Sequence, residues 1–215
     1  MIENTVLEYG FRNTSKNDIN ELTDFLAKEF LQTEPMNYGL KMSKESKEPK
    51  LKKLLSNDFL INNSFVAFSK KDGKIIGVRL IDLIKRNDKQ KDNVNNEEVS
   101  EGQKLINNIL NSVKKDLWNL LSDNINVLIR TEISCVSKDW FRKGIASKLE
   151  NEGNNIIKNK FPEVQGVVAE ASSVANQTLL RNKGYISLKQ SFYCDYGMPI
   201  GYEGSDHIEL MVKLF

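Results

Sequence analysis

The first third of the chain alternates strand-like runs with amphipathic helical patterns. Residues 7–12 alternate apolar and polar side chains, which is the period of a half-buried strand. From Ile19 to Phe30 the apolar residues recur at spacings of three and four, which predicts a helix with one buried face. Pro35 is expected to end this helix, because the residue before a proline avoids the helical conformation.

A second helix and a hairpin are expected next. Residues 47–57 set leucines against lysines, as an amphipathic helix does. Residues 64–69 and 74–81 are rich in β-branched and aromatic side chains, which predicts two strands. The dipeptide Asp72-Gly73 joins them and tolerates the positive φ angles of a tight hairpin.

Residues 86–101 interrupt this pattern. They are Asn, Asp, Lys, Gln and Glu with two valines, and they bury too little apolar area to offset the entropy lost on ordering. We expect a mobile, polar surface insertion there.

The second half of the chain returns to regular alternation. Residues 102–122 carry a broad apolar stripe and predict a helix. The further elements expected are strands at 127–136, 164–170, 186–193 and 207–215, with helices at 143–160 and 173–182. Strands alternating with helices predict a single α/β domain over residues 1–215, built on a mixed sheet.

Composition narrows the class of protein. Apolar residues make up 40% and charged residues 28%, which fits neither a disordered chain nor a membrane protein. Lys plus Arg (31) against Asp plus Glu (29) leaves a net charge of +2, which argues against a dedicated nucleic-acid binder. The first residues show no basic-then-apolar leader, and the two cysteines form no CxxC pair, so we expect a reduced, cytoplasmic protein. One histidine without a Cys/His cluster gives a metal ion no ligand set, and we expect none.

Residues 140–147, WFRKGIAS, connect an expected strand to an expected helix. Gly144 and Ala146 are small, and they leave backbone N–H groups exposed at the start of the expected helix. These N–H groups and the positive end of the helix favour the binding of a phosphate. Arg142 and Lys143 add two cations. An ordinary turn with solvent-facing basic residues explains the same residues, and the turn alone does not decide between the two. It matches neither the Rossmann nor the P-loop pattern.

Several segments resemble one known superfamily. Residues 136–146 (VSKDWFRKGIA) resemble the acyl-CoA-binding motif (Q/R)xxGx(G/A) of the GNAT N-acetyltransferases, and residues 172–185 look like its second motif. Residues 30–36, 193–196 and 207–213 resemble segments of the invertebrate-type arylalkylamine N-acetyltransferases. The resemblance implies a GNAT-like domain whose twisted, mostly antiparallel sheet has about seven strands flanked by helices.

The resemblance also implies a reaction, the transfer of an acetyl group from acetyl-CoA to a small primary amine of the arylalkylamine type. Direct attack in a ternary complex is expected, because no activated cysteine is placed for a covalent intermediate. The N–H of Cys135 or Val136 would polarise the acetyl carbonyl if the strand splays there. The residues implied in binding acetyl-CoA are Cys135, Val136, Phe141, Arg142, Lys143, Gly144, Ile145, Ala146, Ser147 and Ser173.

The same resemblance suggests candidates for acid–base catalysis. Glu34 is the first candidate for the general base and Glu132 is its rival; Glu132 is also a possible contact of the amine. Ser172 matches a proton-relay serine, although a serine at this place can also be a helix cap. Tyr38 and His207 are expected to line the amine pocket.

Other functions remain open at this level. A GNAT enzyme could act on a polyamine, an amino acid or a protein lysine, and a polyamine site should gather several carboxylates. A degenerate domain that binds CoA or a protein without turnover is favoured by Phe141, which replaces the Gln/Arg of the motif, and by Leu180, which replaces a common tyrosine. The partners expected are the amine and acetyl-CoA, with no nucleic acid and no membrane, and the protein is expected to be a monomer.

Overall fold

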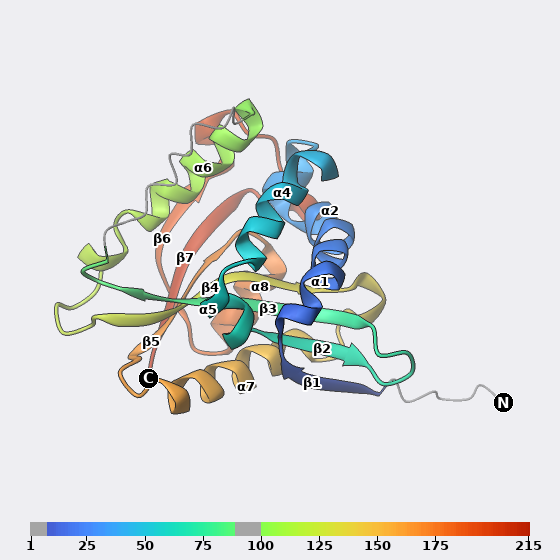
Figure 1. Ribbon diagram of the computed structural model, residues 1–215. Helices are drawn as coiled ribbons and strands as arrows, with labels where there is room; N and C mark the ends of the chain where they lie inside the picture. Colours follow the sequence, from blue (N-terminus) through green and yellow to red (C-terminus); the bar gives the residue numbers. More distant parts are fainter. Residues whose placement is uncertain (1–7, 89–99) are drawn as a thin grey trace.

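The computed structural model describes residues 8–88 and 100–215, which build one seven-stranded mixed sheet with the order β1-β2-β3-β4-β5-β7-β6 (Figure 1). β4 and β5 run parallel, and every other neighbouring pair is antiparallel. The strands are β1 (Tyr9–Asn13), β2 (Phe65–Ser69), β3 (Ile75–Lys85), β4 (Val127–Val136), β5 (Gly166–Ala171), β6 (Ile186–Phe192) and β7 (His207–Leu214). The predicted mixed, mostly antiparallel sheet is confirmed.

Helices cover both faces of this sheet. Their bounds are α1 (Ile19–Phe25), α2 (Leu31–Thr33), α3 (Pro35–Gly39), α4 (Lys44–Leu55), α5 (Asp58–Asn63), α6 (Glu101–Lys114), α7 (Ile145–Lys160) and α8 (Val174–Asn182). Helices α1, α4 and α6 lie on one face and α7 lies on the other (Figure 1). Leu22 of α1 packs with Leu80 of β3 on the first face, and Leu149 of α7 packs with Ile129 of β4 on the second.

The centre of the sheet opens between its two parallel strands. β4 and β5 pair only from Ile129 with Val167 to Thr131 with Ala169. Leu80 then pairs with Ile133 and Ile81 with Thr131, so Glu132 is an extra residue on β4, a β-bulge. A bulge bends its strand and increases the local twist. The ends of β4 and β5 therefore separate beyond the bulge, which is the splay that the family resemblance requires.

Several predicted boundaries differ from those in the structure. The helix expected over 102–122 ends at Lys114 and is followed by the 3-10 turn η3 (Leu117–Asn119). Arg86, expected to begin the mobile insertion, is fixed instead. Its guanidinium donates to carbonyl oxygens of Trp118, Leu121, Ser122 and Ile125 and lies over the Trp118 ring.

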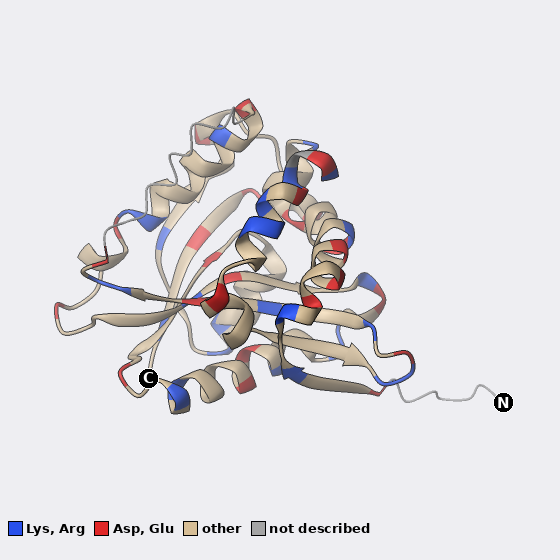
Figure 2. Cartoon of the chain, in the orientation of Figure 1, with Lys and Arg blue, Asp and Glu red and all other residues tan. Residues whose placement is uncertain are grey.

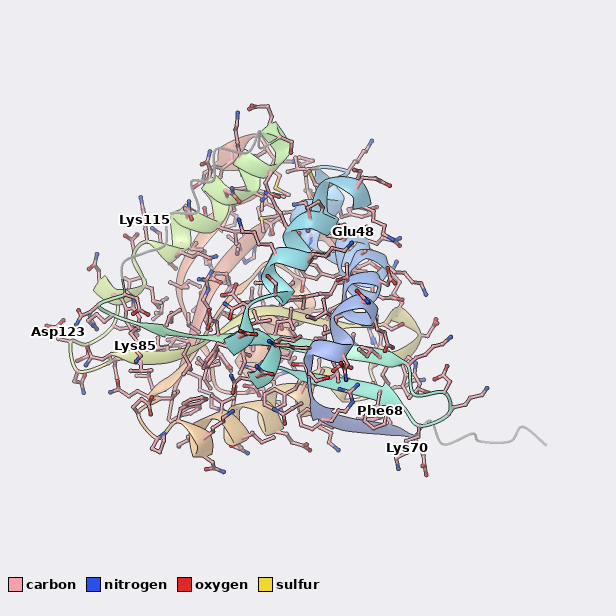
Figure 3. The ribbon with its side chains drawn as sticks, in the orientation of Figure 1. Glu48, Phe68, Lys70, Lys85, Lys115 and Asp123 are labelled. Carbon is pink, nitrogen blue, oxygen red and sulfur yellow. The ribbon has the colours of Figure 1, made fainter. Side chains whose placement is uncertain are left out.

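The other end of the expected insertion is also ordered. The hydroxyl of Ser100 accepts a hydrogen bond from the N–H of Gln103, and α6 begins at Glu101. Residues 89–99 of the expected insertion lie outside the described residues. Lys85 and Asp123, which flank the ordered contacts of Arg86, lie at the same end of the molecule (Figure 3).

Helix α4 and its neighbour also differ from the prediction. The helix expected over 47–57 begins earlier, at Lys44, and ends at Leu55; a separate helix, α5, follows it. No described helix is long and apolar enough to span a membrane.

Candidate active site

Glu34 sits at the junction between α2 and α3. The backbone of Glu34 is extended (φ −72°, ψ 122°), as expected before a proline, and Pro35 is the first residue of α3. The Glu34 carboxylate caps that helix by accepting hydrogen bonds from Met36 N (3.2 Å) and Asn37 N (2.8 Å). The helix break that Pro35 predicts thus fixes the carboxylate in place.

A π-helical turn precedes this junction. Residues Leu26–Phe30 form a π turn between α1 and α2, a feature that often marks a functional site and that the sequence pattern does not predict. Glu29 of this turn is buried, and its carboxylate accepts hydrogen bonds from Lys138 N (3.2 Å) and from Ser137 Oγ (3.3 Å). The π turn therefore ties the helical segment to the end of β4.

Glu34 is surrounded by groups from distant parts of the chain. It is only 7% exposed, and the Ser172 side chain, at the end of β5, acts on its carboxylate as a hydrogen-bond donor that lowers its pKa. The Tyr193 hydroxyl in turn donates to the carbonyl oxygen of Ser172 (3.1 Å). Burial raises the pKa of Glu34 above its ordinary value, while the Asn37 and Met36 N–H groups, the Ser172 hydroxyl and the charge of Lys47 act in the opposite direction. A carboxyl with a raised pKa is a better proton acceptor than an exposed one.

Lys47 is a buried cation whose charge lowers the pKa of Glu34, and the sequence reasoning missed it. It is 7% exposed, and its Nζ donates to Gln103 Oε1 of α6 over 2.5 Å. Lys47 precedes Leu51 by four positions and Leu55 by eight, so it lies on the apolar face of α4. That spacing is the signal that could have identified it.

Glu132 is placed differently from Glu34. Arg130 Nε lies 3.3 Å from Glu132 Oε1 and 3.6 Å from Glu170 Oε2. Burial raises the pKa of Glu132, and the Arg130 charge opposes that rise. The guanidinium therefore holds the rival carboxylate in an ion pair at the bulge.

A cavity of about 580 Å³ opens beside α3. Tyr38 and Tyr202 line it and pack edge to face, with ring centroids 5.4 Å apart. Its complete lining is Leu31, Gln32, Asn37, Tyr38, Gly39, Lys41, Met42, Lys138, Ile200 and Tyr202. The two aromatic rings and the aliphatic side chains suit an apolar body on a ligand, and none of these lining residues is acidic.

His207 lies elsewhere. Its ring is 2.6 Å from Asp206 Oδ1 and 3.0 Å from Glu209 Oε1, and it packs against Phe192. Neither His207 nor Phe192 lines the cavity. The structure therefore brings Tyr38, but not His207, to this pocket.

The turn before α7 has the features of an anion site. Gly144 adopts φ +75° as the N-cap of α7, and a Cβ built there would meet nothing within 4 Å. The helix has no acidic residue in its first turn and no side-chain cap, so the N–H groups of Ile145, Ala146 and Ser147 have no acceptor within the helix. Lys143 lies over the Trp140 ring with its Nζ 5.2 Å from the centroid. Backbone donors, an open approach and nearby cations suit the pyrophosphate of CoA.

The N–H groups of Cys135 and Val136, the two alternatives that the sequence left open, face opposite sides of β4. Ser137 N donates to Ile76 O of β3 (2.8 Å). Because N–H groups alternate along a strand, the Cys135 N–H also faces β3, and the Val136 N–H faces the side from which β5 has diverged. Val136 rather than Cys135 is thus placed to donate into the opening.

The two adjacent serines have different positions. The Ser173 hydroxyl caps α8 by accepting from Asn176 N (3.2 Å), whereas the Ser172 hydroxyl reaches Glu34. Among residues 8–88 and 100–215, no group of three or more His, Cys, Asp or Glu side chains could hold a metal ion.

Comparison with known proteins places the fold. No family model and no curated protein matches the chain. Arylalkylamine N-acetyltransferase 2 of Aedes aegypti has a similar structure, with a TM-score of 0.75 at 18% identity over 96% of this chain and 99% of that one. Drosophila melanogaster polyamine N-acetyltransferase has a TM-score of 0.71 at 13% identity, over 97% of this chain and 100% of that one. A GNAT-family acetyltransferase from Streptococcus pneumoniae has a TM-score of 0.57 at 19% identity, also over 97% of this chain and 100% of that one. The chain therefore has the fold of the GNAT N-acetyltransferases, the superfamily that residues 136–146 resemble.

Proposed function

We propose that the protein is an acetyl-CoA-dependent N-acetyltransferase that acts on a small primary amine, with arylalkylamines as the first class of acceptor. The single observation that carries the proposal is the buried Glu34 carboxylate, which the N–H groups of Met36 and Asn37 hold in place and whose pKa burial raises and Ser172, at the end of β5, lowers. It joins a candidate base to the opening between β4 and β5 of a GNAT fold.

Two groups of backbone N–H donors are proposed to bind acetyl-CoA. The N–H groups of Ile145, Ala146 and Ser147 hold the pyrophosphate, with Arg142 and Lys143 nearby. Acetyl-CoA supplies the thioester that is attacked. The Val136 N–H donates to the thioester carbonyl oxygen and favours the charge that develops there.

Glu34 is the proposed base. Primary alkylamines have pKa values near 10, so most of the acceptor arrives as an ammonium and must lose a proton before attack. Glu34 accepts that proton directly or through a water, and Ser172 orients its carboxylate. Glu132 is the weaker candidate because Arg130 neutralises it in an ion pair.

The cavity supports a monoamine with an aromatic or aliphatic body. Tyr38 and Tyr202 offer aromatic walls, and Lys41 and Lys138 would repel a second positive charge. One observation favours a polyamine as the second candidate. Glu132 and Glu170 lie together beside Arg130, so carboxylates do gather on β4 and β5.

Release of CoA thiol with a panel of amines tests the proposal. We expect arylalkylamines to give the highest kcat/KM, above agmatine, spermidine, free amino acids and a lysine peptide. A preference for agmatine or spermidine would instead support the carboxylate pair as the acceptor site. Binding of acetyl-CoA without turnover of any amine would make this a degenerate domain.

A further inference from the structure

Asn37 is a buried cavity residue whose side-chain oxygen is unused. It is 6% exposed, and it lines the cavity beside α3. Its backbone is engaged, because Asn37 N donates to Glu34 Oε2 (2.8 Å) and Met42 N donates to Asn37 O (2.9 Å). In the part of the chain that the structure describes, however, the buried Asn37 Oδ1 has no hydrogen-bond partner. A buried amide oxygen without a donor costs free energy, so a ligand that supplies a donor is favoured there.

The start of α3 explains why this oxygen is free. Glu34 is the N-cap of α3, and Asn37 is the third residue of the helix. In a capping box the side chain at that position accepts from the backbone N–H of the N-cap, but Glu34 N already donates to Phe30 O (2.8 Å). Residues three positions apart lie on one face of a helix, and Asn37 N is itself hydrogen-bonded to the Glu34 carboxylate. The unused oxygen and the proposed base therefore belong to the same helix end.

The charges around the cavity make a specific acceptor necessary for a cation. Lys41 and Lys138 line the cavity, and none of its lining residues is acidic. Lys138 Nζ lies 5.5 Å from the centroid of the Tyr202 ring, so a cation already occupies one aromatic wall. Helix α4, which begins at Lys44, two residues after the lining residue Met42, is also rich in lysine (Figure 2). These charges repel an ammonium, so its binding depends on individual acceptor atoms.

We propose that Asn37 Oδ1 accepts a hydrogen bond from the ammonium of the acceptor amine and so presents that amine to Glu34; this inference rests on the proposed function. An amide oxygen only accepts, so the ligand group that satisfies it is a donor, and a primary ammonium carries three N–H donors. One of them serves Asn37, and another carries the proton that Glu34 takes up. The terminal amide torsion of asparagine has a broad preference, so a small rotation turns Oδ1 toward a ligand in the cavity.

Asn37→Leu removes the acceptor and keeps a branched side chain. We use phenylethylamine, an arylalkylamine, as the probe. Its KM should rise about 10- to 100-fold, as expected for the loss of a hydrogen bond to a charged group, while the KM for acetyl-CoA stays near that of the wild type. The melting temperature should stay the same or rise, because the variant no longer buries an unpartnered polar atom. A purely structural role for Asn37 predicts a lower melting temperature and no selective change in the KM for the amine.

Asn154 of α7 provides a matched control. It is 5% exposed, its Oδ1 is likewise buried without a partner among the described residues, and it does not line the cavity. Asn154→Leu should therefore leave the KM for phenylethylamine unchanged. An unchanged KM in Asn37→Leu, or an equal rise in both variants, would overturn the proposal.

A binding measurement separates this role from the enzyme assignment. CoA carries no acetyl group, so with saturating CoA an NMR titration gives the Kd of phenylethylamine without turnover. Ethylbenzene has the same ring but no amino group and reports on the apolar wall alone. Asn37→Leu should weaken phenylethylamine about 10- to 100-fold and should not weaken ethylbenzene. Equal weakening of both ligands would contradict the inference, because Asn37 would then only shape the wall.

The two proposals can fail separately. If the wild type binds phenylethylamine but acetylates no amine, the enzyme assignment fails, and the two Kd values still decide the role of Asn37. Turnover with equal Kd values for phenylethylamine in the wild type and Asn37→Leu would refute the role of Asn37 alone. Wild-type protein that binds no phenylethylamine would overturn both proposals. If Asn37→Leu does not fold, Asn37→Ala removes the same acceptor and takes its place in both measurements.

Discussion

The Ser172 side chain, which follows β5, lowers the pKa of the Glu34 carboxylate that caps α3. The proton affinity of the proposed base therefore depends on a hydroxyl group from a distant segment. This relationship links α3 to the residue that follows β5, and β5 borders the opening beside β4.

Glu34→Gln should lower kcat by about 10- to 1,000-fold, the usual contribution of one general base, with little change in acetyl-CoA affinity. The variant should also lose the acidic limb of its pH–rate profile. Glutamine is a poorer helix cap, so a melting curve should accompany the kinetics and show a loss of about 1 kcal/mol. Full activity in Glu34→Gln together with inactivity in Glu132→Gln would make the strand carboxylate the base.

The adjacent serines offer a matched pair. Ser172→Ala removes a hydrogen bond that lowers the pKa of Glu34, so that pKa should rise, and activity should be lost at a higher pH as the solution is acidified. Ser173→Ala removes only the α8 cap and should cost about 1 kcal/mol of stability without moving the acidic limb. Profiles of kcat/KM against pH, with melting temperatures, distinguish the two variants. Identical shifts in both would show that the Ser172 contact is not specific.

Gly144→Val should raise the KM for acetyl-CoA strongly. The φ of +75° at Gly144 is disfavoured for a side chain with a Cβ, so the substitution distorts the turn whose N–H groups are to hold the pyrophosphate. Gly73, in the hairpin between β2 and β3, has nearly the same φ, +74°, and open space where a Cβ would lie. Gly73→Val therefore controls for backbone strain alone. An unchanged acetyl-CoA affinity in folded Gly144→Val would refute the site.

Residues 89–99 should be dispensable for catalysis. Replacing them by a short Gly-Ser linker, with Arg86 and Ser100 retained, should leave the melting temperature and the turnover near those of the full chain. Arg86→Ala should instead lower the melting temperature, because it removes the donors that bind four backbone carbonyls. Loss of turnover in the linker variant would show that the replaced residues take part in the reaction.

The sequence predicts the elements whose pattern is local. A strand is predicted over 127–136 because its run of apolar and β-branched residues is long and bounded, and β4 has the same bounds. The β2–β3 hairpin follows in the same way from Asp72-Gly73, with φ +74° at the glycine. Pro35 marks the break at Glu34 because its ring restricts the residue before it. The family likeness, carried by residues 136–146 together with 30–36, 172–185, 193–196 and 207–213, predicts the fold.

Only the tertiary structure decides the features that depend on partners distant in the sequence. The bulge at Glu132 is defined by the register of β4 against β3, and the short pairing of β4 with β5 is likewise a property of the assembled sheet, which no local pattern in the sequence records. The effect of Ser172 on the pKa of Glu34 and the hydrogen bond from Lys47 to Gln103 each depend on segments that become neighbours only when helices pack on the sheet. Local backbone preferences are encoded residue by residue, whereas the proton affinity of a buried carboxyl is set by whatever the completed fold places around it.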